Sequence, residues 1–402
     1  MTQQSEKHGG ELETIAEQYS IDVNSLIDFS VNVNPLGPPA SLLDAIKKGV
    51  DFLHRYPDSS SRRMRRKLAN YLNLSSENII IGNGATELIY LISRCFKESV
   101  HTPNVVIVAP TFSDYQRSVS LVGGQVQHHL LSSETCSLRS PTASPYGSLR
   151  SPTSSAYGFQ LNIDRLIADA MEVEHLPRSG IPQGGTDEDG ADIVFICTPN
   201  NPTGQLFQKS QIIALATTLP KTLIVVDEAF LDFTDEPHHN SVCRDVINFP
   251  NLIVLRSMTK LFAIPGLRLG YLVAHQNLVE CLNQYKEPWT VNIFAQIAGE
   301  MLLDETDYVR KTRKLVKAER EFLFNQLKQL SWLIPFPSAA NFLLVRIEGK
   351  DLPATILKEK LIKKGILIRN CSNFVGLDES FFRIAVKKRD ENLKLISALK
   401  AI

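Results

Sequence analysis

The sequence lacks the features that would tie it to a membrane, a nucleic acid or an oxidising compartment. No apolar stretch approaches the roughly 18 residues of a membrane-spanning helix, and the first ten residues lack the apolar core of a secretory signal. Lys and Arg together number 43, as do Asp and Glu, so no net charge attracts DNA, RNA or anionic lipid. The six cysteines form no C-x-x-C pair, which argues against disulfides and zinc. We therefore expect a cytoplasmic protein without a metal, a membrane contact or a nucleic-acid partner.

Short apolar runs alternate with amphipathic stretches over much of the chain. Typical buried strands are predicted at 104–109, 193–197, 223–226 and 252–255, and helices at 85–97 and 112–122. This alternation is typical of an α/β domain with a largely parallel sheet. The C-terminal part predicts a long charged helix at 307–330, then strands at 342–347, 366–368 and 382–386 and helices at 354–364 and 390–400.

Two polar stretches interrupt this pattern. Residues 137–147 and 148–158 form a tandem repeat rich in Ser, Pro, Thr and Gly, and 174–190 is similarly polar. Such composition cannot bury enough apolar surface to form a core, so we expect low-complexity insertions at 132–158 and 174–190. The expected organisation is an N-terminal arm at 1–40, a large cofactor-binding domain at 41–291, and a linking helix with a small α+β domain at 292–402.

Two motifs follow predicted strands and carry residues suited to chemistry. In Ser257-Met258-Thr259-Lys260 the lysine comes after a buried strand and a hydroxyl-bearing turn, with Arg268 eight residues further on. A lone lysine is usually a surface residue, but this setting is unusual for one. Asp227 ends the run Ile224-Val225-Val226, and the carboxyl ends of parallel strands are where open α/β sheets bind ligands.

Two further motifs are weaker when considered alone. Thr198 to Gly204 reads TPNNPTG after another strand, which is turn chemistry in any protein. Gly82 to Glu87 reads GNGATE at the start of a helix, where exposed amides and the helix dipole favour a phosphate. Phe112, in Pro110-Thr111-Phe112, would be interpreted as a core residue if the other motifs were not present.

In order and spacing, these motifs resemble the fold-type I pyridoxal-phosphate enzymes, which have the aspartate-aminotransferase fold. The resemblance implies that pyridoxal 5'-phosphate is the cofactor, that Lys260 holds it as a Schiff base, and that Asp227 keeps its pyridine nitrogen protonated. It also implies that Asn201 donates to the ring oxygen, Phe112 stacks on the ring, and Tyr56 reaches the cofactor of a neighbouring subunit in a homodimer. The implied ligands of the cofactor phosphate are Gly84, Ala85, Thr86, Thr259 and Arg268.

Within that group the sequence resembles histidinol-phosphate aminotransferases and, more closely, threonine-phosphate decarboxylases. The start His8-Gly9-Gly10, the segment DFSVNVNPLGP at 28–38, and ILIRNCSNFVGL at 366–377 with FRIAV at 382–386 carry the second resemblance. Phe230 agrees, since it stands where the aminotransferases usually have a tyrosine. The resemblance implies that two arginines hold the substrate's phosphate and carboxylate, helped by four other residues: Arg369 and Arg383, with His8, Gly9, Asn32 and Asn201.

The expected reaction is decarboxylation of L-threonine O-3-phosphate to (R)-1-aminopropan-2-yl phosphate in cobalamin biosynthesis. Whether CO2 or a proton leaves depends on which bond the anchors hold perpendicular to the ring, and the residues alone do not give that angle. The alternative is therefore a histidinol-phosphate aminotransferase of histidine biosynthesis. A non-catalytic cofactor-binding regulator is a remote third reading. Which arginine takes the phosphate also stays open.

Overall fold

The computed structural model describes residues 9–99, 103–135, 157–173 and 190–402. Its larger part is built around a seven-stranded sheet with the order β2-β10-β9-β8-β7-β3-β4. Strand β10 is antiparallel to both neighbours, and the other pairs are parallel. The strands span Ile79–Gly82 (β2), Asn104–Ala109 (β3), Gln125–Leu130 (β4), Ile193–Cys197 (β7), Leu223–Asp227 (β8), Leu252–Ser257 (β9) and Gly270–Ala274 (β10).

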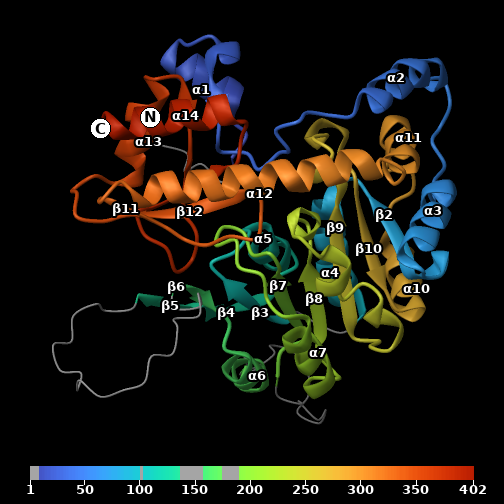
Figure 1. Ribbon diagram of the computed structural model, residues 1–402. Coiled ribbons are helices and arrows are strands. Elements are labelled where there is room, and N and C mark those ends of the chain that lie inside the picture. Colours follow the sequence, from blue (N-terminus) through green and yellow to red (C-terminus); the bar gives the residue numbers. More distant parts are fainter. Residues whose placement is uncertain (1–8, 100–102, 136–156, 174–189) are drawn as a thin grey trace.

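The central strands are apolar along their whole length because helices cover both faces of the sheet (Figure 1). All residues of β7, β8 and β9 are buried. Alternate side chains of one strand enter separate cores: Val194 and Ile196 pack on one face, and Phe195 and Cys197 on the other. The helices of this part are Ala40–Gly49 (α2), Arg62–Leu72 (α3), Gly84–Ser99 (α4), Asp114–Leu121 (α5), Ile163–Met171 (α6), Lys209–Thr218 (α7), Pro237–Asn240 (α8), Met258–Leu261 (α9), Gln276–Tyr285 (α10) and Ile293–Leu302 (α11).

A smaller antiparallel sheet with the order β11-β12-β15-β14 forms the second part. Its strands are Leu333–Pro335 (β11), Phe342–Ile347 (β12), Arg369–Asn370 (β14) and Phe381–Ala385 (β15), with helices Ala354–Ile362 (α13) and Arg389–Lys400 (α14). Helix α12, Thr306–Lys328, runs from beside α11 to β11 and so joins the two parts (Figure 1). Its fully buried Val316, Leu323 and Leu327 anchor it in the cores.

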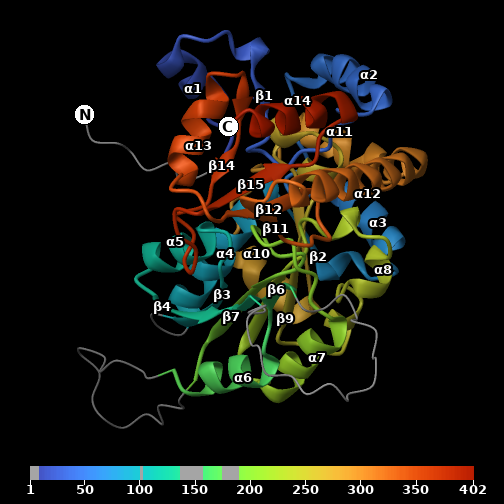
Figure 2. The same cartoon turned by 60° about the vertical axis from the view of Figure 1, so that its left-hand side comes forward.

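The N-terminal arm packs against this smaller part (Figure 2). Strand β1, Ile27–Asp28, pairs in parallel with β13, Ile366–Leu367. Helix α1, Leu12–Tyr19, buries Ile15 against Ile362 of α13. Phe29, fully buried, enters the core of the small sheet, so the residues just after it are held at the junction of the two parts.

The predicted α/β class and aspartate-aminotransferase-like fold are confirmed. Strands were predicted with the observed bounds at 104–109, 193–197 and 342–347, whereas β9 continues to Ser257, into the motif of Lys260. Residues 137–156 of the repeat and 174–189 of the second polar stretch lie outside the described residues. The ends of the expected insertion at 132–158 are more regular than their composition suggests, because Ser132–Thr135 (β5) pairs with Tyr157–Gln160 (β6).

Short 3-10 segments complete the described elements at Val23–Ser25, Val50–Phe52, Ser76–Asn78, Leu231–Phe233, Asp245–Ile247 and Pro265–Leu267. Among the described helices, none combines the length and apolar character needed to cross a membrane.

Candidate active site

A cavity of about 710 Å³ opens where the carboxyl ends of β3, β7, β8 and β9 meet the N-terminal arm and the small sheet. Loops after parallel strands converge at one edge of such a sheet, which brings residues far apart in sequence together. Thirteen of the candidate residues line this one cavity: Gly9, Asn32, Gly84, Ala85, Thr86, Phe112, Asn201, Asp227, Thr259, Lys260, Arg268, Arg369 and Arg383.

Lys260 lies on the single turn of α9, directly after β9. Its carbonyl accepts a hydrogen bond from the Asn34 backbone at 3.1 Å, so the arm fixes the lysine backbone. Burial, together with the charges of Arg383 and Arg268, lowers the pKa of Lys260 to about 8, while Asp227 opposes the shift. An amine with this pKa is neutral in a substantial fraction of molecules near pH 8 and can attack a carbonyl carbon.

Asp227 ends β8 and is buried in the wall of the cavity. Its Oδ1 accepts from the Ala229 amide at 2.9 Å and its Oδ2 from the Tyr115 hydroxyl at 2.6 Å. Burial raises the pKa of this carboxyl, and the two hydrogen bonds and the charges of Lys260 and Arg256 counteract that shift. The geometry can present a carboxylate to a cationic ring nitrogen.

The start of α4 forms a cradle suited to a phosphate. Gly84 has φ +82°, and a Cβ there would lie 2.7 Å from Arg268 Nη2, so only glycine leaves this space open. The backbone amides of the first helical turn are available to an anion, and the helix dipole favours one. In the same cavity the Ser257 and Thr259 hydroxyls contact each other at 2.7 Å. Cation, amides and hydroxyls therefore fit the phosphate of pyridoxal phosphate.

Arg369 and Arg383 face each other in the register of β14 and β15, and both are buried. Arg369 donates to Asn370 O at 2.6 Å and Asn373 Oδ1 at 2.9 Å. Arg383 donates to Asn201 Oδ1 and, at 2.8 Å, to Ser30 O, and among the described residues its Nε has no partner. Burial and the Arg369 charge lower the pKa of Arg383 to about 10. Like charges opposed across a ladder are destabilising, so this arrangement favours an anionic ligand.

The arm closes one side of the cavity. Asn32 is buried, and its Oδ1 has no hydrogen-bond partner in the part of the chain that the structure describes. Within the arm, Gly9 lies so close to the Ser30 backbone that a Cβ on it would meet Ser30 O at 2.6 Å. His8 lies outside the described residues. Tyr56 is 83% exposed and does not line this cavity; its ring instead lies 5.3 Å from that of Trp289.

Sequence reasoning missed several residues that line the cavity: Tyr90, Asp114, Tyr115, Arg117, Cys197 and Phe374. For Tyr115 a signal was present, since it stands three residues after Phe112, the spacing of one face in the helix predicted at 112–122, although α5 itself begins only at Asp114. Phe374 lies within the motif at 366–377, but no role was predicted for it. Its ring lies 5.3 Å from the Arg369 guanidinium.

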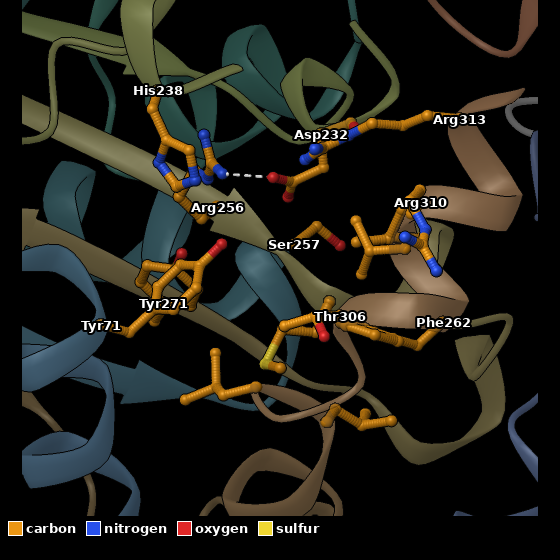
Figure 3. Close-up of a pocket in the computed structure, with 15 residues that line it drawn as sticks. Tyr71, Asp232, His238, Arg256, Ser257, Phe262, Tyr271, Thr306, Arg310 and Arg313 are labelled. Atoms are coloured by element: carbon orange, nitrogen blue, oxygen red, sulfur yellow. Dashed lines mark hydrogen bonds and ion pairs between the residues drawn. The ribbon is translucent and has the colours of Figure 1, made fainter. Parts of the chain in front are cut away.

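A second cavity, of about 220 Å³, lies behind β9 and shares Ser257 with the first (Figure 3). There Arg256 donates to Glu228 at 2.8 Å and to Asp232 at 2.7 Å. This buried ion cluster ties the end of β9 to the segment that follows Asp227. These ion pairs therefore hold β9, which precedes Lys260, against the segment that follows Asp227 at the end of β8.

The fold and the fit of this cavity define a pyridoxal-phosphate-dependent enzyme, as the sequence predicted. The chain belongs to the aminotransferase class I and II family, whose model matches residues 24–399. It is 33% identical to the threonine-phosphate decarboxylase of Salmonella typhimurium, over 98% of this chain and 96% of the relative. A Caldanaerobacter subterraneus protein, whose name proposes the same activity, is 37% identical over 92% of this chain and 89% of the relative. The solved histidinol-phosphate aminotransferase of Clostridium acetobutylicum is 30% identical, with a TM-score of 0.77 over 94% of this chain and 98% of that one.

Proposed function

We propose that this enzyme decarboxylates L-threonine O-3-phosphate to (R)-1-aminopropan-2-yl phosphate and CO2, as a step of cobalamin biosynthesis. The observation that carries the proposal is the buried pair Arg369 and Arg383, opposed on adjacent strands at the cavity wall. A substrate with two anionic groups would neutralise the positive charges of these two buried guanidinium groups. The names of the two relatives support the same substrate and reaction.

The residues around the cavity suggest how the cofactor is held. Lys260 would supply the amine that binds it covalently, and Asp227 would face its pyridine nitrogen. The start of α4, Thr259 and Arg268 would hold its phosphate, and Phe112 would cover the ring; all of them line the one cavity. When bound, pyridoxal phosphate supplies an electron sink for whichever bond at the substrate Cα stands perpendicular to its ring.

The chain's own groups then select that bond. Arg369 and Arg383 fix the two anions, and Asn201 and Asn32 supply amide groups beside them. If the anchored pose turns the substrate carboxylate out of the cofactor plane, the bond to CO2 would be the one that breaks. The Cα atom would then need a proton, and the Lys260 amine, which lines the same cavity, is placed to hold and deliver it.

Histidinol-phosphate transamination is the rival reading, because a solved relative with that activity is 30% identical. Phe230 counts against it. This buried side chain packs edge-on against Phe342, with ring centroids 5.0 Å apart, and it has no hydroxyl to support the ring oxygen.

One experiment decides between the two reactions. Purified enzyme loaded with pyridoxal phosphate is given L-threonine O-3-phosphate, and CO2 is trapped. In parallel it is given histidinol phosphate with 2-oxoglutarate, and glutamate is measured. We expect CO2 release and little glutamate. Robust transamination without CO2 would overturn the proposed reaction while leaving the fold and the cofactor in place.

We further infer a homodimer that works in the cytoplasm without a nucleic-acid partner. Large apolar side chains are exposed on and near η2 (Val50–Phe52), among them Leu53 at 60% and Tyr56 at 83%. Trp289, 51% exposed, lies beside Tyr56. Sedimentation equilibrium should give twice the mass of one chain, and Leu53→Glu should weaken that association. A monomer that turns over at the full rate would contradict the role of Tyr56 at a neighbouring cofactor.

A further inference from the structure

Tyr115 is the closest polar partner of the Asp227 side chain. Its hydroxyl donates to Asp227 Oδ2 at 2.6 Å, and the tyrosine is fully buried. The ring cannot turn freely, because it stacks on Phe195 at 5.0 Å with an interplanar angle of 9°. It also meets the Phe112 ring edge-on at 5.7 Å. The hydroxyl also contacts the buried Cys197 thiol, and its own proton is donated to Asp227 Oδ2.

This contact determines how the carboxylate faces the cavity. A carboxylate offers about four acceptor positions, two on each oxygen. The Ala229 amide occupies one on Oδ1 and the Tyr115 hydroxyl one on Oδ2, so the plane of the group is fixed from both sides. The remaining positions are left for a donor in the cavity, which Asp227 lines.

The contact also bears on the charge of Asp227. Burial raises the pKa of this carboxyl, and the Tyr115 hydrogen bond opposes that shift. The other groups facing it are the Ala229 amide, Lys260 on α9, Arg256 on β9 and the buried Cys197 thiol on β7. The pKa of Tyr115 itself is raised well above its usual value, because burial disfavours the phenolate, so the hydroxyl stays a donor.

We propose that Tyr115 is a positioning residue, whose buried hydroxyl holds the Asp227 carboxylate in the orientation and charge state that a cofactor pyridine nitrogen requires. The proposal rests on the function proposed for Asp227. Tyr115 touches neither substrate nor cofactor through this hydroxyl, since its proton is directed at Asp227. It acts through the carboxylate.

The test is Tyr115→Phe, which keeps the ring stack and removes only the hydroxyl. Cofactor affinity of the stripped enzyme should weaken roughly tenfold, the usual effect of losing a hydrogen bond to a charged group. In the loaded enzyme kcat should fall more than KM rises. The acid limb of the kcat profile should move to higher pH, because a less stabilised carboxylate takes up a proton more readily.

Ser118→Ala is the matched control. It removes another buried hydroxyl from α5, one that contacts Ser93 and the Tyr115 carbonyl but not Asp227. It should change neither the affinity nor the pH profile. Replacing Tyr115 by 3-fluorotyrosine, whose hydroxyl is a stronger donor, should move the acid limb to lower pH. This variant keeps the hydroxyl, so it gives a result even if Tyr115→Phe folds poorly.

A double-mutant cycle separates this proposal from the proposed function. In an Asp227→Asn background, Tyr115→Phe should have little further effect. If Asp227→Asn retains activity, the role given to Asp227 fails. If Asp227→Asn is inactive but Tyr115→Phe keeps the normal affinity and acid limb, the positioning role alone is overturned.

Discussion

Asn201 accepts a hydrogen bond from the guanidinium of Arg383 through its side-chain oxygen. A guanidinium has only donors, so the oxygen of the amide must face it and the NH2 group must face elsewhere. That NH2 is then free to donate to an acceptor in the cavity, as the ring oxygen of the cofactor would be. The contact couples a proposed substrate anchor to a proposed cofactor ligand.

Arg383→Gln should lower kcat/KM for L-threonine O-3-phosphate by about 100-fold, the effect of about 3 kcal/mol, because one substrate anion loses its partner in a buried site. Part of the loss should appear in kcat, since Asn201 loses its fixed orientation as well. Arg346→Gln is the control. Arg346 lies on β12 and pairs at 2.7 Å with the exposed Glu348, away from the cavity. If the two variants behaved alike, the anchor role of Arg383 would be wrong.

Asp227→Asn should bind the cofactor but lose most of its turnover. The amide is neutral, so it cannot keep a pyridine nitrogen protonated, while its size lets the fold persist. Thermal unfolding should show a Tm close to that of the unchanged enzyme, and steady-state assays should show the loss in kcat. Near-normal kcat would mean that the electron sink does not depend on this carboxylate.

The residues that sequence reasoning placed in the site were those with a local signal. Lys260, Asp227 and Asn201 each follow a strand whose apolar run is obvious, and the topology of a parallel sheet brings such positions together. The start of α4 was found from its glycines, because Gly84 must adopt a positive φ.

Residues that act through a partner gave a weaker signal. Tyr115 reads as one more aromatic in an amphipathic helix, and only the fold shows its hydroxyl on Asp227. The ion cluster of Arg256, Glu228 and Asp232 was likewise missed, because its members pair across strands rather than along a motif. No strand was predicted at the position of β10. Its antiparallel direction depends on long-range pairing, which periodicity does not contain.

The tandem repeat should be dispensable. Thr135 and Tyr157 are directly opposite in the β5–β6 pair, so an Asn-Gly turn can replace residues 136–156 and close the hairpin. The deletion should stop short of 157–158, which belong to β6. Replacing residues 136–156 by two residues alters the closure entropy by about 2 kcal/mol, in favour of the shorter loop. Turnover and Tm should stay close to those of the full chain, and loss of either would show that the segment contributes to folding or catalysis.

The lowered pKa of Lys260 should be visible when the cofactor is loaded. Only the neutral amine attacks the aldehyde of pyridoxal phosphate, so the loading rate of stripped enzyme should rise with pH and level off above about 8. An ordinary lysine would continue to gain reactivity up to about pH 10.4. The rate is followed by the absorbance of the covalently bound cofactor. Borohydride should then fix the label on the peptide that contains Lys260, and Lys260→Ala should show neither the label nor turnover.

Asp227→Asn tests the effect of the Asp227 charge on the pKa of Lys260. Because the Asp227 charge raises the pKa of Lys260, its removal should move the midpoint to lower pH. A midpoint near 10 in the unchanged enzyme, or label on another lysine, would contradict the assignment of Lys260.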